Sequence, residues 1–589
     1  MAAAPGIQQL LWKLLQYFHV SLSFSSTKSL PPLRKRRVIS IKIRFPRFVL
    51  RLGLGLLAIE GCLGITRTST PTTRMRSNSP RDQKTASPAI CCAPPNPEIR
   101  KANSRLVFNS PVQIQTACAG DSCYTSAVDA IQPDVIPFAL GEPFPDPDGI
   151  QIVTIMTQNE ASLAEFGGNR DFVALWHIAG GENPFGNLTA YLERYLAFVS
   201  AGPFLPALAW TTYDSDPSQA ILTSFILEGD VIALNRAAYF GENCVPELRP
   251  INSPRVPINP YFSHAVLSGR QIFTSLLTAD NLTLSVADQT RRVLGYIESI
   301  LAQEGQGLSS LIEVSVQLAD ASKQSEMDAV YAKFFADRGL TPPVRTLFMA
   351  AVFLVPGQVG AAVGIRATAL KVYDHCPHQS NLVNFYNVPE VFHESTTLSS
   401  VGAQANGYIY FGGVFGTILP PGGSTPPSEP ESLSATYYRA MQNMLYVVAR
   451  KGSNLPDLID LWTSFVQGLE GYNQLAGGLA NIYNSTSYLV PAVTFDVGGI
   501  NPFGFRYQLS GIFYNADFFN YEAFPSPYPW EINAQLLADV FGPGNYTNNH
   551  YCSSSSLATC AKPGFFYSNY PLQPGQSLGS QPMRSNDLH

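Results

Sequence analysis

The chain has 589 residues, of which 45% are apolar and only 14% are charged, and its formal net charge is −5. Average soluble proteins are about 25% charged, so the body is expected to bury much of its surface against protein. This apolar content excludes a wholly disordered chain, and the length allows two or three domains or a single large one.

The charge is divided along the chain. Residues 1–100 hold sixteen Lys or Arg residues and three acidic ones, whereas the remainder holds 22 basic and 40 acidic residues. An asymmetry of this size indicates a basic tail beside an acidic body. We therefore predict that residues 1–104 form a largely disordered basic arm. Its apolar run, Phe48–Ile65, is interrupted by Arg51 and Glu60, so it falls short of a membrane span.

The arm contains a stretch, Pro31–Arg51, that has eight cations and no carboxylate. Three explanations fit it: phosphate binding along a nucleic acid, an organelle transit peptide, and a basic flank against acidic lipid. Nucleic-acid binding is favoured, because a cationic arm neutralises phosphates without needing a fixed geometry. The predicted nucleic-acid-binding residues are Arg34, Lys35, Arg36, Arg37, Lys42, Arg44, Arg47 and Arg51.

The folded body is predicted to begin at residue 105. Amphipathic periodicity predicts helices near 187–201, 285–304, 324–338 and 432–451. The second of these has the clearest start, because Ser285 and Asp288 have the spacing of a capping box. Apolar runs at Asp171–Ile178 and Leu205–Tyr213 indicate buried strands or short buried helices. We assign residues 105–418 and 433–486 to one helix-rich shell domain.

The remaining segments have distinctive compositions. Residues 419–432 are rich in Pro, Gly and Ser, which is typical of a surface loop. Residues 487–572 are rich in aromatic residues, Asn and Pro, which suits a β-rich subdomain or an arm, and 573–589 reads as a disordered tail. The sequence shows no internal repeat. The predicted fold class is α+β and helix-rich, with a large shell domain and a protruding, loop- and β-rich region.

Nine cysteines occur without a CxxC pair, so free thiols are expected, with local disulfides such as Cys118–Cys123 as the alternative. No phosphate loop, zinc-helix or nucleophile-elbow motif is present, and no catalytic residue, metal or cofactor is predicted. His177 is read as a satisfied core histidine, and Asp457 and Asp460 as solvated charges on a short helix. Residues 373–395 provide the best enzyme candidate, a cluster made of Asp374, His375, Cys376, His378, His393 and Glu394.

Over residues 105–570 the chain resembles the capsid proteins of small double-stranded RNA viruses, the partitivirus and totivirus-like group. The similar features are the helix-rich middle, the segment Ala201–Asp214 after a helix, and the proline- and aromatic-rich C-terminal third. The resemblance implies an α-rich shell domain with a protruding region, assembled as dimers into an icosahedral particle.

The expected function is thus a capsid protein without catalytic activity that self-assembles around an RNA genome. Its expected partners are further copies of itself, genomic RNA and a viral polymerase, with no small-molecule substrate. The expected location is the virion and the host cytoplasm. The alternative is an organelle-imported or secreted hydrolase that uses the 373–395 cluster for metal or acid–base chemistry. Sizing separates the two, because a shell protein sediments as particles of megadalton mass.

Overall fold

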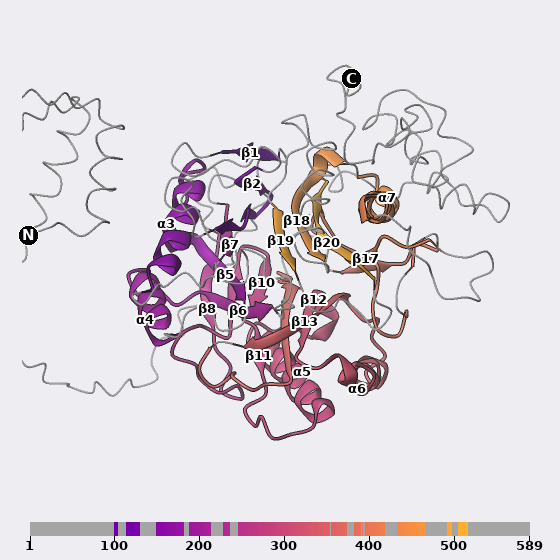
Figure 1. The fold of residues 1–589 in the computed structure, drawn as a ribbon, viewed down its shortest axis with the longest axis horizontal. Helices are drawn as coiled ribbons and strands as arrows, with labels where there is room; N and C mark the ends of the chain where they lie inside the picture. Colours follow the sequence, from indigo (N-terminus) through magenta and orange to yellow (C-terminus); the bar gives the residue numbers. More distant parts are fainter. Residues whose placement is uncertain are drawn as a thin grey trace, which may run out of the picture. The chain divides into compact units, whose positions relative to one another are not determined.

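The structure is a computed structural model that describes most of residues 99–515 (Figure 1). These residues contain twenty strands and five α-helices. The described ranges are 99–103, 114–129, 149–181, 188–213, 228–235, 246–353, 355–373, 382–389, 391–392, 395–418, 433–453, 455–465, 492–496 and 505–515.

The strands fall into three successive units with the same topology, here called repeats 1, 2 and 3. In repeat 1 the strand order is β1-β2-β3-β7-β5-β6, in which only β5 and β6 are parallel neighbours. Along the chain, α3 lies between β4 and β5, and α4 lies between β5 and β6. Its elements are β1 (Arg100–Ala102), β2 (Thr116–Ala119), β3 (Ser122–Thr125), β4 (Val128–Asp129), α3 (Ile150–Ala164), β5 (Val173–Gly181), α4 (Leu188–Val199), β6 (Ala207–Tyr213) and β7 (Glu228–Leu234).

Repeat 2 has the corresponding order β8-β9-β10-β14-β12-β13, and its β12 and β13 are again parallel. Its last strand in this order, β13, pairs with β6, so the sheets of repeats 1 and 2 are continuous. Its elements are β8 (Leu248–Ile251), β9 (Ala265–Ser268), β10 (Gln271–Thr274), β11 (Leu277–Thr278), α5 (Val286–Ala302), β12 (Leu311–Leu318), α6 (Gln324–Ala336), β13 (Val344–Phe353) and β14 (Val363–Leu370).

Repeat 3 forms a separate sheet with the order β15-β16-β17-β20-β18-β19, in which β18 and β19 are parallel. Its elements are β15 (Asn384–Tyr386), β16 (Gly402–Ala405), β17 (Tyr408–Phe415), α7 (Leu433–Ala449), β18 (Leu458–Phe465), β19 (Ala492–Asp496) and β20 (Tyr507–Tyr514). The prediction that the chain has no internal repeat is therefore wrong.

Two local details show that the repeats are equivalent residue by residue. The first is a register shift at the start of the central strand: Ala174, Ile312 and Ile459 each have no opposite residue on the neighbouring antiparallel strand. A bulge of this kind changes the direction of the side chains that follow it, and bulges persist within families.

The second detail is the hairpin between the second and third strand of each repeat. It has a two-residue turn, Gly120-Asp121, Gly269-Arg270 or Asn406-Gly407. The first residue of each turn has a positive φ, of 51°, 60° and 51° respectively. Gly and Asn tolerate this backbone conformation best, which explains these residues at the three turns.

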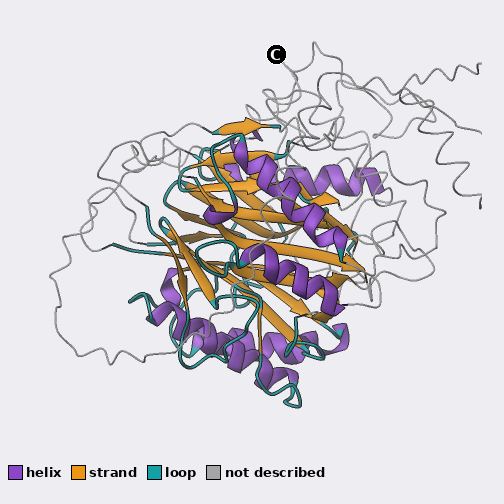
Figure 2. Cartoon of the chain, turned by 90° about the vertical axis from the view of Figure 1, so that its left-hand side faces the viewer, coloured by secondary structure: helices purple, strands orange, loops and turns teal. Residues whose placement is uncertain are grey.

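The predicted fold class is wrong in its emphasis, because strands rather than helices dominate the described residues. The protein is a mixed α/β structure with three sheet-containing repeats. Figure 1 shows α3 and α4, α5 and α6, and α7 each beside the strands of their own repeat, and Figure 2 shows helices in front of the strands and below them. The shell domain with a protruding region is not what these residues form.

Side-chain alternation along the central strands defines two faces of each sheet. In β5, Trp176 and Ile178 belong to the apolar core that also contains residues of the helices. The opposite faces of all three sheets share a second core, in which Leu175 of β5, Ile312 of β12 and Ile459 of β18 take part. Successive strand residues point to opposite faces, so each sheet packs its helices on one side and the other repeats on its inner side.

The predicted helices are confirmed as α4, α5, α6 and α7. The capping prediction also holds, because the Asp288 N–H donates to the Ser285 hydroxyl at 3.1 Å. The apolar runs predicted as strands or short helices are β5 and β6. The sequence patterns do not predict α3. None of the helices within the described ranges combines the length and hydropathy needed to cross a membrane.

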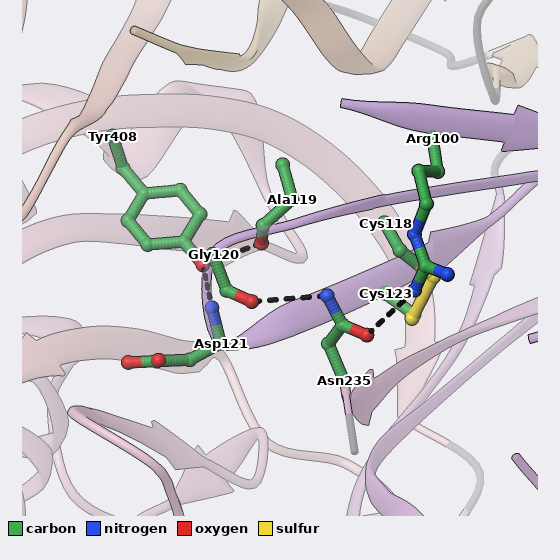
Figure 3. Close-up of a disulfide and its surroundings, with 8 residues drawn as sticks. All are labelled: Arg100, Cys118, Ala119, Gly120, Asp121, Cys123, Asn235 and Tyr408. Carbon is green, nitrogen blue, oxygen red and sulfur yellow. Dashed lines mark hydrogen bonds between the residues drawn. A yellow bond between two sulfur atoms is a disulfide. The ribbon is translucent and has the colours of Figure 1, made fainter. Parts of the chain in front are cut away.

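The free-thiol expectation fails for one cysteine pair, since Cys118 and Cys123 form a disulfide across the β2–β3 hairpin (Figure 3). The two residues lie opposite each other in the strand register, with Cα atoms 4.0 Å apart. The same hairpin is held by Asn235, whose side-chain amide donates to the Gly120 carbonyl at 3.0 Å. The disulfide thus links the two strands of a hairpin whose turn is also held by a hydrogen bond from Asn235.

Candidate functional site: a polar cluster where the three repeats meet

The inner faces of the three sheets bring equivalent positions together. By strand register, His177 of β5, Ser315 of β12 and Trp462 of β18 occupy equivalent positions in their repeats. Each lies opposite a residue of the neighbouring antiparallel strand, which is β7, β14 or β20 respectively. Those neighbours are Asp230, Arg366 and Ser510. Each repeat therefore contributes different chemistry at the same place in the fold. We call His177, Asp230, Glu313, Arg366, Asp460 and Trp462 the central cluster.

His177 and Asp230 form the repeat 1 part of the central cluster. The Nδ1 atom of His177 lies 2.9 Å from an Asp230 carboxylate oxygen, and the two residues are 2% and 4% exposed. When the imidazole is neutral, donation from Nδ1 to the carboxylate makes Nε2 the nitrogen with the lone pair. An oriented, buried imidazole of this kind is suited to general-base chemistry.

Trp462 of repeat 3 connects the other two repeats. Its ring lies 4.6 Å from the His177 ring, centroid to centroid, and its Nε1–H donates to Asp460 at 3.0 Å. The Arg366 guanidinium of repeat 2 lies 4.9 Å from the centroid of the Trp462 ring. This distance is within the range of a cation–π interaction. One indole thus contacts the histidine, the guanidinium and a carboxyl group.

Two carboxyl groups, Glu313 and Asp460, occupy equivalent positions just after the strand bulges. Burial raises the pKa of Asp460 well above its usual value, and the nearby charges of Asp230 and Glu313 raise it further. Burial also raises the pKa of Glu313, against the opposing effect of Arg366 and of a hydrogen bond from Thr368. Both shifts favour the neutral acid, which can donate a proton.

Asp460 is expected to make the stability of the native protein depend on pH. Its folded pKa is raised, so its contribution to stability is complete below the unfolded value, near 3.8, and is lost as pH rises through the folded pKa. The stability of Asp460→Asn relative to that of the native protein should therefore rise as pH increases from about 4 toward the folded pKa, by about 1.4 kcal/mol for each unit of pKa elevation. Urea unfolding across this range measures the difference, and a difference that stays constant with pH would contradict the assignment.

A second polar group lies at the hairpin end of the same interior. The Arg270 guanidinium contacts the Asp121 carboxylate at 2.7 Å, and these residues are the equivalent second residues of two hairpin turns. Figure 3 shows Tyr408 of repeat 3 beside the first turn, where its hydroxyl accepts from the Asp121 N–H at 2.7 Å and donates to the Ala119 carbonyl at 2.8 Å. All three repeats are therefore tied together at this end.

The residues predicted from the sequence lie elsewhere or have other roles. The eight arm cations lie outside the described residues, as do Asp374, His375, Cys376, His378, His393 and Glu394. The reading of Asp460 as a solvated helix residue is wrong, since it lies in β18 and is 5% exposed. His177 is the buried, paired histidine expected, yet its partner, Asp230, was not foreseen. Across the described ranges, no three His, Cys, Asp or Glu side chains are arranged to hold a metal ion.

A signal for the central cluster was present in the sequence. Arg366 lies within VGIRATAL, Asp460 within LIDLWTSF and Asp230 within EGDVIAL, and each is a charge inside an otherwise apolar or small-residue strand. Charged residues are almost never fully buried unless they are paired, so such positions indicate a polar interior.

Comparison with known proteins identifies repeat 2. The family model described as Endoribonuclease L-PSP matches residues 251–371, which run from the last residue of β8 to just beyond β14. A RutC family protein of Pyrococcus horikoshii is 35% identical over 92 residues, which cover 15% of this chain and 71% of that protein. Among solved structures, Escherichia coli TdcF with bound serine is 26% identical and covers 21% of this chain and 99% of its own, with a TM-score of 0.19. A chorismatase structure is 11% identical and covers 58% of this chain and 93% of its own, with a TM-score of 0.36.

The family model and the RutC relative overturn the resemblance to capsid proteins and the function and partners inferred from it. The prediction of a non-enzymatic shell protein is wrong, because repeat 2 belongs to a family of small-molecule-binding proteins with enzymatic members. The predicted partners, namely sister copies in a shell, genomic RNA and a viral polymerase without any small-molecule substrate, are corrected for the same reason. The hydrolase alternative agrees better with the comparisons, although not through the residues named for it. Through residues 251–371, the chain belongs to the RutC family, also described as the endoribonuclease L-PSP or Rid family.

Proposed function

We propose that the protein is an enzyme that hydrolyses the C=N bond of a small enamine or imine, releasing ammonia and leaving a carbonyl compound. The family found in repeat 2 supports an enamine or imine deaminase. The observation that carries the proposal for this chain is the buried His177–Asp230 pair beside the carboxyl group of Asp460. Such a site pairs an imidazole that can accept a proton with a carboxyl group whose neutral form is favoured by burial.

The reaction needs four proton transfers, two to the reacting molecule and two from it. Protonation of an enamine at carbon, or of an imine at nitrogen, gives an iminium carbon that water can attack. Nε2 of His177 takes a proton from the attacking water, and Asp230 stabilises the imidazolium that forms. The resulting amino alcohol then breaks its C–N bond as the nitrogen receives a proton, and the hydroxyl proton leaves as the carbonyl forms. The sum is one imine and one water converted into one carbonyl compound and one ammonia.

Asp460 is the acid best placed for this role. It is 5% exposed, and its Oδ2 atom accepts from the Trp462 indole. Its other oxygen, Oδ1, is buried and has no hydrogen-bond partner within the described part of the chain. A buried polar atom without a partner is costly, so it is expected to serve a ligand or a reacting group.

Architecture supports the same function. Rid proteins form homotrimers that bind small molecules, whereas this chain carries three units of the same topology in one polypeptide. In a homotrimer, the inner faces of the sheets would be buried between subunits. In this protein the corresponding faces are buried within one chain. We therefore expect the active form to need no second copy.

The proposal is tested with the purified full chain and imines generated in situ by an amino-acid oxidase. Ammonia release is followed against the spontaneous rate, with semicarbazide as a competing trap for the imine. The expected result is a protein-dependent acceleration that lowers the yield of trapped imine. If a panel of aliphatic and aromatic imines hydrolyses at the spontaneous rate, the proposed activity is refuted.

A further inference from the structure

We propose that Tyr124 and Asp460 form an oxyanion hole, and that the protein therefore also interconverts the keto and enol forms of a small ketone or aldehyde. An oxyanion hole is a set of hydrogen-bond donors that holds the oxygen on which negative charge develops during a reaction. This second activity goes beyond the proposed hydrolysis of C=N bonds. It uses the base assigned there, His177, but it does not require an imine substrate.

The first argument is the hydroxyl group of Tyr124, in β3. The side chain is 1% exposed, and no acceptor for its proton lies within hydrogen-bonding distance in the described part of the chain. Tyr408, in the same interior, shows the usual arrangement of a buried phenol, because its hydroxyl donates to Ala119 and accepts from Asp121. A buried hydroxyl that donates to nothing is unfavourable, so we expect a ligand to accept this hydrogen bond.

The other two repeats show that packing does not require the Tyr124 hydroxyl. By strand register, Tyr124, Phe273 and Tyr410 occupy equivalent positions, and all three rings belong to the second core. Repeat 2 fills the position with a phenyl ring, and in repeat 3 the Tyr410 hydroxyl accepts a hydrogen bond from Gln271. The hydroxyl of Tyr124 is therefore an addition to a ring that already fills its place in the core.

The second donor is Asp460. Its Oδ2 atom accepts from the Trp462 indole at 3.0 Å, so in the neutral acid the proton belongs to Oδ1, which has no partner among the described residues. The strand that carries Asp460, β18, contacts β3. Burial raises the pKa of Tyr124, and the charge of Asp460 raises it further, against the opposing effect of two nearby donors, Ser122 and Tyr410. Two buried O–H groups are thus close together, and both favour the neutral form that can donate.

The base lies beside these two donors. The His177 ring is 4.6 Å from the Trp462 ring, centroid to centroid, and the same indole bonds to Asp460. Tyr124 lies on β3, which pairs with β7, the strand that carries the Asp230 partner of His177. A base on one side and two neutral donors on the other are the groups that proton abstraction next to a carbonyl needs.

The proposed reaction balances without an oxidant or a reductant. Nε2 of His177 removes a proton from the carbon next to the carbonyl group. The C–H electron pair forms the C=C bond, and the C=O π pair moves to the oxygen, where Tyr124 and Asp460 donate to it. The imidazolium then gives the proton to this oxygen, which completes the enol and restores the neutral base. The sum is an isomerisation of one ketone to one enol.

The experiment follows the exchange of the α-hydrogens of phenylacetone for deuterium in D2O by ¹H NMR, with the full-length protein. Exchange requires enolisation, so the protein is expected to accelerate it above the buffer rate. Tyr124→Phe should lower the protein-dependent rate about 10²- to 10³-fold, the loss usual for one oxyanion-hole donor. It should fold with an equal or higher melting temperature, because Phe273 fills the equivalent position in repeat 2. Asp460→Asn should lose less activity, since its amide N–H still donates.

Tyr195→Phe is the matched control. Tyr195 is 0% exposed and its hydroxyl has no partner in the described ranges either, but it lies in α4 and belongs to the core on the helix side. Its replacement should leave the exchange rate unchanged. Absorbance titration with p-nitrophenol, whose phenolate resembles an enolate, is the second readout. The native protein and Tyr195→Phe should bind it equally, and Tyr124→Phe about 10-fold more weakly or worse, as expected for a lost hydrogen bond to a charged oxygen.

The results separate this inference from the proposed function. Hydrolysis of imines with α-hydrogen exchange at the buffer rate would overturn the oxyanion hole and leave the proposed hydrolysis standing. Equal exchange and equal nitrophenol binding by the native protein and Tyr124→Phe would do the same. Exchange that is lost in Tyr124→Phe, in a protein that hydrolyses no imine, would support the oxyanion hole and refute the deaminase. Equal losses in Tyr124→Phe and Tyr195→Phe would also overturn the inference, because they would assign the effect to packing.

Discussion

His177→Gln is expected to fold and to lose about 10²- to 10⁴-fold in kcat for imine hydrolysis, the usual contribution of a general base. Glutamine keeps an N–H that can face Asp230, but it has no nitrogen lone pair with which to accept a proton from water. Asp230→Asn should reduce kcat as well, because the imidazole then lacks the carboxylate that orients it and stabilises its charged form. Steady-state kinetics of the purified variants, with circular dichroism to verify folding, measures both effects.

The matched control is His264→Gln. His264 is also buried, at 1% exposure, but Nδ1 accepts from the Ser253 N–H and the other ring nitrogen lies 2.9 Å from the Pro257 carbonyl. Its replacement should lower stability while kcat stays near the native value. If His177→Gln keeps native kcat, or if both histidine variants lose activity in proportion to their stability, the role assigned to His177 is wrong.

The second large effect is expected at the hairpin end of the interior. Asp121→Asn should lower the free energy of unfolding by about 3–5 kcal/mol, because it leaves the Arg270 charge buried without its partner. Asp121 is 0% and Arg270 7% exposed, and their closest atoms are 2.7 Å apart. Repeat 3 contacts the same turn, because the Tyr408 hydroxyl accepts from the Asp121 N–H, so loosening of this turn is expected to reach all three repeats. Urea denaturation measures the loss.

Two further variants test whether the loss of stability comes from the unpaired buried charge. The double variant Asp121→Asn with Arg270→Met should cost less than the sum of the single changes, because it removes both charges. Asp337→Asn breaks the exposed Lys333–Asp337 ion pair of α6, in which both side chains are more than half exposed. It should change the free energy of unfolding by less than 1 kcal/mol. A cost below 1 kcal/mol for Asp121→Asn would show that the buried pair does not join the repeats.

The low charge content has a different cause from the one first inferred. We expected flanks buried against sister copies, whereas the structure buries the inner faces of three sheets against one another within one chain. Each sheet is thereby covered on both faces, by helices outside and by other repeats inside. The apolar inner faces are thus buried without contact between copies, so the low share of charged residues, 14%, does not require a shell.

The candidate site could be predicted only in fragments. Three hairpin turns carry glycine or asparagine, and Asn406-Gly407 in particular is a strong hairpin signal, so the repeated strand–turn–strand pattern was open to detection. The partners of the charged residues were not. Asp230 and Arg366 lie at equivalent positions, yet their side chains have opposite charge, so similarity between the repeats does not reveal the equivalence.

The sequence by itself determined α4 to α7 and their buried faces, because a helix depends on contacts three and four residues apart and on local caps such as Ser285. It also determined the turns that need a positive φ. Tertiary structure alone decided the sheets and the central cluster. Asp121 and Arg270 are 149 residues apart, and Asp121 and Tyr408 are 287 apart. Strand pairing and the meeting of repeats join such distant segments through register and burial, which no local pattern encodes.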